Sequence, residues 1–162
     1  MLKLFYLIAA SSIYATLAQT CPASYSNTFV ICSSSETDIV DTNMNYLKKA
    51  VVVGTNSGWW ANIPNNQWIW SANGEANVNF GVKIDLSIKP STATLNVAVD
   101  DYASVYINSQ SISECAPYGF QSVRTCNILP YLVVGANNIR FAATDTGGAA
   151  GFLFRIEIVS SR

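Results

Sequence analysis

The feature that most constrains this chain is an alternation of apolar and polar residues with a period of two. The alternation is clearest in Asn77–Leu86, where every second residue is apolar. Those apolar positions are Val78, Phe80, Val82, Ile84 and Leu86. Because successive side chains of a strand point to opposite faces, this segment is predicted to be a half-buried antiparallel strand.

The same alternation returns several times along the chain, separated by turn sequences such as Lys89-Pro90-Ser91 and Gly147-Gly148. Further strands are predicted at Leu95–Val99, Val105–Ile107, Phe152–Ile158, Thr28–Cys32, Ala50–Val53, Gln67–Trp70 and Asn138–Ala143. Asp41–Lys49 has weak helical character, and Ile128–Leu132 is predicted to form a short helical turn around Pro130. The pattern predicts an all-β fold, an antiparallel β-sandwich or jelly roll of about eight or nine strands with at most one or two short helical turns.

The N-terminal segment predicts secretion. Lys3 precedes the apolar run Leu4–Ala18, which ends in Thr16-Leu17-Ala18, the small-residue pattern that signal peptidase accepts. The alternative, a membrane anchor, is disfavoured because a spanning helix needs roughly 20 apolar residues. We therefore expect a signal peptide at residues 1–18, no membrane insertion, and a single β-sandwich domain at residues 19–162. Residues 19–35 are expected to be an N-terminal arm or the first strand of that domain.

Four cysteines follow the predicted cleavage point, which indicates two disulfides in a secreted chain. They are Cys21, Cys32, Cys115 and Cys126. Three pairings are possible, and the local one, Cys21–Cys32 with Cys115–Cys126, closes two loops of equal length. No pair forms a CxxC motif, so a redox or zinc role is not indicated.

Charge and residue types argue against several functions. The chain has 9 Lys and Arg against 10 Asp and Glu, so it has no electrostatic attraction for nucleic acid. It has no histidine, which removes the commonest general base and every Ser-His or Cys-His nucleophile pair. Asp100 and Asp101 are adjacent, and neighbours on an extended strand point to opposite faces, so they make a poor acid and nucleophile pair. We expect a protein without catalytic activity.

Aromatic residues give the best indication of a ligand site. Trp59 and Trp60 follow the loop sequence Gly54–Gly58, so at least one indole ring is expected to be exposed. A flat ring suits the C–H face of a sugar, while Asp and Asn side chains bind its hydroxyls. The candidate ligand-binding residues are Trp59, Trp60, Asp100, Asp101, Tyr102 and Tyr118. The alternative is that these rings pack inside the sandwich, as we expect for Trp68 and Trp70.

Four motifs, in order along the chain, resemble the galactose-binding-like β-sandwich family, which includes many carbohydrate-binding modules. They are Trp68–Ser71, Leu95–Asn108 with its acidic turn and Val-Tyr-Ile-Asn strand, Tyr131–Phe141, and the glycine-rich Gly147–Ile156. Ser109 stands where the family usually has glycine, so the turn after Asn108 is expected to be less tight. The resemblance implies the fold but no sugar specificity, because one sandwich serves many functions.

Sandwiches of this type often hold a structural calcium ion, and Asp100, Asp101 and Asp145 are the residues that would bind it. The alternative for Asp100-Asp101 is a β-turn in which one carboxylate accepts a backbone N–H.

Two functions remain open at this point. The first is recognition of carbohydrate or another extracellular surface ligand by loops at one end of the sandwich. The second is a homo-oligomer or polymer, an extracellular filament or coat subunit, in which residues 19–35 add a strand to a neighbouring sheet edge. The alternative for this arm is that Thr28–Cys32 is the sandwich's own first strand.

Overall fold

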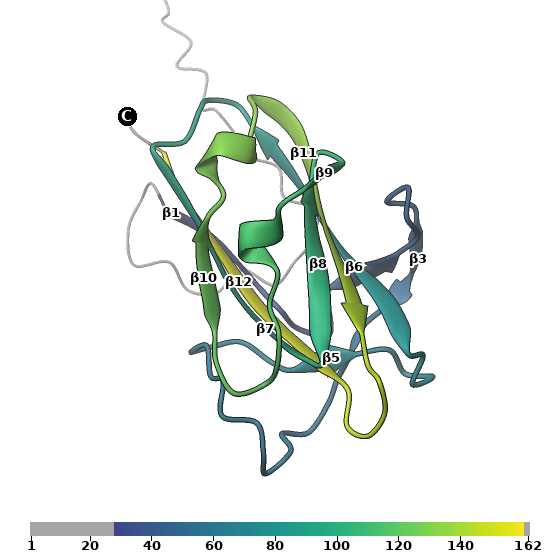
Figure 1. Cartoon of the computed structure of the whole chain (residues 1–162). Helices are drawn as coiled ribbons and strands as arrows, with labels where there is room; N and C mark the ends of the chain where they lie inside the picture. The colour runs from purple at the N-terminus through teal and green to yellow at the C-terminus, as the bar shows by residue number, and fades with distance from the viewer. Residues whose placement is uncertain (1–27, 161–162) are drawn as a thin grey trace, which may run out of the picture.

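Alternating apolar positions bring two antiparallel sheets face to face in a computed structural model that describes residues 28–160 (Figure 1). These residues form twelve strands and two short 3-10 helices. The strands are β1 (Thr28–Cys32), β2 (Asp38–Val40), β3 (Tyr46–Lys49), β4 (Val51–Val52), β5 (Ile69–Trp70), β6 (Asn77–Leu86), β7 (Thr92–Asp100), β8 (Tyr102–Ile107), β9 (Gln110–Ser111), β10 (Arg124–Asn127), β11 (Gly135–Thr144) and β12 (Gly151–Val159). The helices are η1 (Ser113–Cys115) and η2 (Leu129–Tyr131).

Each sheet has six strands. Sheet A has the order β3-β2-β6-β11-β8-β9, and sheet B has the order β10-β7-β12-β5-β4 with β1 also paired to β12. All the pairings are antiparallel. The predicted all-β antiparallel sandwich is therefore confirmed.

Aromatic rings from both sheets meet in the core. Phe80 of β6 stacks on Phe152 of β12 with ring centroids 4.8 Å apart, and Phe141 of β11 lies 5.0 Å from Phe154. These four rings are fully buried. Burial of each contributes roughly 1.5–3 kcal/mol, and the Phe80–Phe152 stack joins the two sheets across the core.

The long strands were predictable, and the short ones were not. The predicted segments Asn77–Leu86 and Thr28–Cys32 coincide with β6 and β1, and the predicted turn around Pro130 is η2. The expected number of about eight or nine strands is too low, because β2, β3, β9 and β10 have two to four residues each. So few residues carry almost no alternation signal.

The helical character expected for Asp41–Lys49 is wrong. The carboxylate of Asp41 accepts hydrogen bonds from the backbone N–H groups of Asn43 and Asn45, both at 2.8 Å. This closes a tight turn, in which Met44 has a φ of 65°, and β3 then pairs with β2. A short polar side chain that bonds the backbone two residues on competes with the helix.

The turn after Asn108 is also tighter than expected. Ile107 pairs with Gln110, so Asn108 and Ser109 alone form the β8–β9 turn, with φ values of 50° and 68°. Asn108 secures it: its Nδ2 donates to the Tyr131 carbonyl at 3.1 Å, and its Oδ1 accepts from the Asn138 N–H at 2.9 Å. These bonds hold the positive φ that glycine usually supplies.

Cys115 and Cys126 form a disulfide, as the local pairing predicts. The link joins η1 to β10. Cys32 is also disulfide-bonded, and its predicted partner Cys21 lies outside the described residues.

The predicted signal peptide at residues 1–18 and the arm at residues 19–27 also lie outside the described residues. Thr28–Cys32 pairs with β12 from Thr28 opposite Val159 to Cys32 opposite Arg155. This segment is therefore a strand of its own sandwich. Between residues 28 and 160 no helix has the length and apolar character needed to cross a membrane.

Candidate functional site

Three loops gather at one end of the sandwich, which we call the loop end (Figure 1). They are residues 53–68, residues 116–123 and residues 145–150. Backbone hydrogen bonds join the first loop to the second and the second to the β7–β8 bend: Ala61 donates to the Phe120 carbonyl at 3.0 Å, and Gly119 donates to the Asp101 carbonyl at 2.7 Å. The third loop is joined to the same bend by the Thr146 N–H, which donates to the Asp101 carboxylate at 2.8 Å. The loop end is thus a connected surface supported by both sheets.

Trp59 anchors the longest of these loops. Its indole Nε1 donates to the Asp100 carboxylate at 2.7 Å, and its ring lies 4.4 Å from the Trp68 ring. Gly151 makes room for both rings, since a Cβ there would lie 2.5 Å from Trp59 and 2.8 Å from Trp68. Half-buried and with its polar atom occupied, Trp59 contributes more to loop position than to ligand contact.

Trp60 is far more exposed than Trp59. It is 72% exposed, so the expectation that at least one of the two rings lies at the surface is confirmed. Leaving a side chain this large and apolar in water forgoes the free energy that burial would provide, which the half-buried Trp59 partly gains. A large exposed ring beside an anchored one is typical of a binding surface.

A groove of about 640 Å³ opens beside these rings. Trp59 and Trp60 line it, together with the hydroxyl and amide side chains of Thr55, Asn56, Ser57, Asn62, Asn66 and Gln67. We call it the Trp60 groove. A ring surrounded by neutral hydrogen-bonding groups suits a ligand with C–H faces and hydroxyls.

Asn66 carries an unused acceptor in the wall of this groove. Its Nδ2 donates to the carbonyls of Ile63 and Pro64 at 3.2 and 2.8 Å. Its Oδ1 is the one buried side-chain oxygen or nitrogen without a hydrogen-bond partner among residues 28–160. A buried acceptor left unpaired is costly, so an ordered water molecule is expected beside it.

Asp100 and Asp101 act as loop anchors. Asp100 is buried and accepts from Trp59, whereas Asp101 accepts from the N–H of Thr146 at 2.8 Å and from its hydroxyl. Burial raises the pKa of Asp100, and the neighbouring Asp101 carboxyl adds to the rise, while the Trp59 N–H opposes it. The hydrogen bonds from Thr146 lower the pKa of Asp101.

The two carboxylates hold different loops: Asp100 binds Trp59 of residues 53–68, and Asp101 binds Thr146 of residues 145–150. β7 ends at Asp100 and β8 begins at Tyr102, so Asp101 is in a bend where strand alternation no longer holds. Neither residue lines the Trp60 groove. The backbone N–H that Asp101 accepts belongs to Thr146 of another loop, and not to a turn at Asp100-Asp101.

Tyr102 and Tyr118 are exposed, at 43% and 84%, and pair as an isolated β-bridge. Neither lines the Trp60 groove. Of the six predicted ligand-binding residues, the structure thus places Trp59 and Trp60 in one groove and the other four outside it.

Asp100, Asp101 and Asp145 do not suit the suggested calcium site. Asp145 accepts from the Gly147 N–H at 3.1 Å, as the other two carboxylates accept from Trp59 and Thr146. In the part of the chain that the structure describes, no group of three or more His, Cys, Asp or Glu side chains is arranged to hold a metal ion. We assign these carboxylates to loop positioning.

The amides of the groove were missed by the sequence interpretation. Asn65-Asn66-Gln67 directly precedes Trp68, and this run of amides beside tryptophan was the available signal. Ser33, far away in sequence, holds the run in place: its hydroxyl donates to the Gln67 carbonyl at 2.8 Å and accepts from the Phe154 N–H at 3.2 Å. Only the folded chain reveals that contact.

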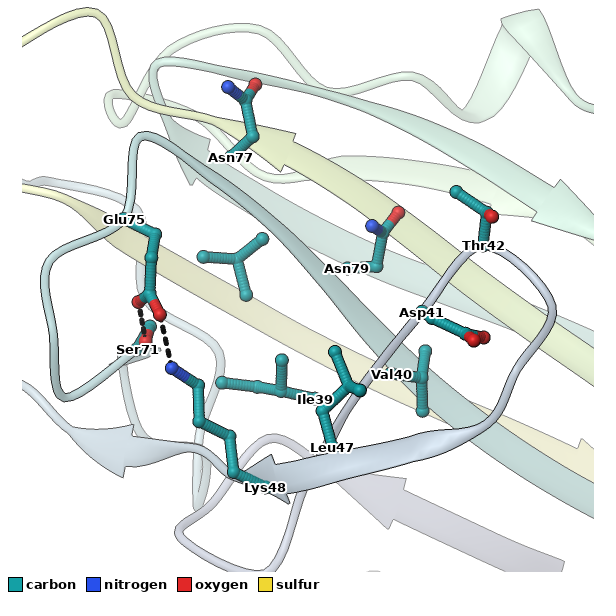
Figure 2. A pocket seen from close by; sticks show the side chains of 11 residues that line it. Ile39, Val40, Asp41, Thr42, Leu47, Lys48, Ser71, Glu75, Asn77 and Asn79 are labelled. Carbon is teal, nitrogen blue, oxygen red and sulfur yellow. Dashed lines mark hydrogen bonds and ion pairs between the residues drawn. The ribbon is translucent and has the colours of Figure 1, made fainter.

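A second cavity, of about 500 Å³, lies on sheet A beside the β2–β3 turn (Figure 2). Glu75 accepts from Lys48 and from the Ser71 hydroxyl at one end, and Asp41 and Thr42 lie at the other. The hydrogen bond from Lys48, and then that from Ser71, lower the pKa of Glu75 to about 2. This cavity has no aromatic lining residue, so the Trp60 groove is the better candidate site for a neutral sugar.

Comparisons with protein-family models and with curated protein sequences find no match. Solved structures are similar in fold. A β-D-glucuronidase of Dictyoglomus thermophilum shares 12% identity over 87% of this chain and 30% of its own, with a TM-score of 0.52. A Streptomyces avermitilis α-L-rhamnosidase shares 17% over 86% of this chain and 16% of its own, also with a TM-score of 0.52. The chain therefore spans less than a third of either enzyme.

A family 35 carbohydrate-binding module from Cellvibrio japonicus Abf62 shares 12% identity over 83% of this chain and 94% of its own, with a TM-score of 0.49. The β-sandwich fold implied by the four sequence motifs is confirmed, and the chain shares it with parts of the two enzymes. At these identities the likeness concerns the fold alone.

Proposed function

We propose that this protein is a secreted, non-catalytic carbohydrate-binding module whose ligand occupies the Trp60 groove. The observation that carries the proposal is the 72% exposed ring of Trp60 over a groove lined by amides and hydroxyls. The β-sandwich fold, which the chain shares with parts of a β-D-glucuronidase and an α-L-rhamnosidase, supports it by analogy.

The groove suits a neutral sugar for three reasons. The indole ring offers an apolar face to sugar C–H groups. The amides of Asn56, Asn62 and Gln67 both donate and accept, as sugar hydroxyls do. No charged side chain lines the groove, so an ionic ligand has no partner there.

Secretion and the lack of catalysis are parts of this proposal that rest on the sequence. The signal-like residues 1–18 and the even number of cysteines support secretion. The lack of histidine and the use of Asp100 and Asp101 as loop anchors support a binding role. We do not propose the filament or coat function, because Thr28–Cys32, the strand it needed, pairs within its own sheet.

The test is affinity electrophoresis of the mature protein and of Trp60→Ala through gels that contain soluble neutral polysaccharides. Loss of the ring is expected to weaken binding by roughly thirtyfold, the size of an aromatic hot spot of about 2 kcal/mol. The unfolding midpoint should stay unchanged, since the ring packs against little of the core.

Tyr46→Ala is the matched control, because Tyr46 is 59% exposed on β3 and lines none of the grooves described. This variant should be retained like the parent protein. Equal retention of Trp60→Ala and the parent would contradict the proposed site, and no retention on any neutral polysaccharide would contradict the function.

A further inference from the structure

A separate groove crosses the outer face of sheet A, about 330 Å³ in volume. The β2–β3 turn with Thr42 and Asn43 borders it on one side, and Ser109 of the β8–β9 turn borders it on the other. Arg140 and Tyr106, directly opposite each other on β11 and β8, line it between these turns. We call it the sheet-face groove.

The wall formed by the β2–β3 turn depends on Gly81. A Cβ at this position would lie 2.7 Å from a Val40 methyl and 3.2 Å from the Met44 methyl. Gly81 pairs with Arg140 across β6 and β11, so the turn rests on the sheet beside the arginine. The groove is therefore a built feature of the sheet's outer face.

Arg140 is held by neutral groups only. Its Nη1 donates to the Asn79 Oδ1 at 2.7 Å, and its guanidinium carbon lies 4.0 Å from the centre of the Tyr106 ring. Within residues 28–160 no carboxylate lies within 4.0 Å of its nitrogens, whereas Arg155 is paired with Glu157 at 2.9 Å. The half-buried guanidinium of Arg140 has five N–H donors, and most of them are available to a ligand.

Among the residues that the structure describes, Arg140 is the one charged side chain that lines the groove. Lys83, directly opposite Asn138 in the β6–β11 register, adds a positive charge to this face, and it contributes to the lowered pKa of Asp41. The nearest acid along the turn, Asp41, already accepts three hydrogen bonds from Asn43 and Asn45. Its carboxylate is thereby engaged with its own turn rather than with Arg140.

We propose that the sheet-face groove is a second ligand site, which binds a saccharide that carries a carboxylate or sulfate group. Arg140 binds the anionic group through two parallel N–H donors, the geometry that such groups favour. The hydroxyls of Thr42 and Ser109 and the amide of Asn138 bind neighbouring sugar hydroxyls. The site is independent of the Trp60 groove, which lies at the loop end.

The cavity of Figure 2 gives such a ligand room to continue. Thr42 borders both spaces, and Asn79, which holds Arg140, also lines the larger one. In Figure 2 the amides of Asn77 and Asn79 follow β6 toward the Lys48–Glu75 pair. A chain of more than one sugar unit can therefore extend across the sheet from Arg140.

The experiment is an NMR titration of the ¹⁵N-labelled mature protein with methyl β-D-glucuronide, glucose 6-sulfate and methyl β-D-glucoside. The acidic probes should shift the signals of Arg140, Asn138 and Ser109 and bind at least tenfold more tightly there than the neutral glucoside, the size of a charge-assisted bond. The two acidic probes distinguish a carboxylate ligand from a sulfate ligand.

Arg140→Gln should remove this preference, and Arg140→Lys, which keeps the charge without the fork, should retain part of it. Arg155→Gln is the matched control, because it removes an arginine of sheet B already paired with Glu157, and it should bind like the parent. Trp60→Ala should also bind the acidic probes normally, which separates this site from the proposed function.

Equal binding of the neutral and acidic probes, or no shift at Arg140 with either acidic probe, would overturn the inference. So would an equal loss in Arg140→Gln and Arg155→Gln, which would indicate nonspecific attraction. If Arg140→Gln does not fold, the location of the shifted signals in the parent protein decides the question.

Discussion

A single buried carboxylate fixes the conformation of the tryptophan loop. Asp100 accepts the Trp59 N–H, and the ring it positions packs on Trp68. In Asp100→Ala the indole N–H loses its acceptor, so the free energy of unfolding should fall by about 1–3 kcal/mol. Urea unfolding at neutral pH, followed by tryptophan fluorescence, measures this loss.

Asp100→Asn is the informative companion at the same position. Asparagine keeps an oxygen that accepts the Trp59 N–H, and it removes an ionised group whose burial raises its pKa. This variant should therefore be at least as stable as the parent at neutral pH. Equal losses in Asp100→Ala and Asp100→Asn would show that the indole hydrogen bond does not hold the loop.

At the scale of elements, the β8–β9 turn places a serine in a backbone conformation that favours glycine. Ser109 has a φ of 68°, a region that costs a non-glycine residue roughly 1–2 kcal/mol. Ser109→Gly should raise the free energy of unfolding by about 1 kcal/mol, because glycine adopts that φ freely. Thermal unfolding of the variant and the parent checks the sign.

Asn108→Gly is the matched control in the same turn. Its backbone also has positive φ, but glycine loses the side-chain bonds to Tyr131, Asn137 and Asn138. This variant should be less stable than the parent. If both glycine variants shift stability in the same direction, backbone strain does not explain the Ser109 position.

The strands differ in how well the sequence predicts them. The alternation of apolar and polar residues predicts β6, which has ten residues and one buried face, and it also predicts β7 and β12. The β2–β3 hairpin does not, because its turn is made by the carboxylate of Asp41 and its packing by the lack of a Cβ at Gly81. The packing of Gly81 against Val40 and Met44 joins residues far apart in sequence, as does the bond from Ser33 that supports the amides of the Trp60 groove.

The candidate site was predictable to the same degree. A loop with two adjacent tryptophans predicted an exposed ring, and Trp60 confirms it. The separation of Tyr102 and Tyr118 from the Trp60 groove depends on how the loop-end segments pack, and no local pattern encodes that packing. Arg140 is a charged residue on the polar face of a strand, and only the cross-strand register places it beside Tyr106 and Gly81.

At the scale of the whole molecule, lowered carboxylate pKa values govern the response to acid. The pKa of Glu75 is lowered from 4.5 to about 2 by Lys48 and Ser71, and hydrogen bonds also lower those of Asp41, Asp101 and Glu114. Such groups stabilise the folded protein above their unfolded pKa and lose that contribution as pH falls through the folded pKa. The parent should thus lose stability below a pH of about 4.5.

Glu75→Gln tests the largest of these contributions. The variant should be less stable than the parent at pH 7, and the two should converge between pH 4.5 and 2, since the parent loses its ionised Glu75 in that window. Lys48→Met should behave similarly, and the double variant should differ little from either single one, because each removes the same ion pair. Thermal unfolding of both proteins from pH 7 to pH 2 measures the difference in stability. If that difference is the same at every pH, the Lys48–Glu75 pair, which joins β3 to the β5–β6 loop, contributes packing rather than charge.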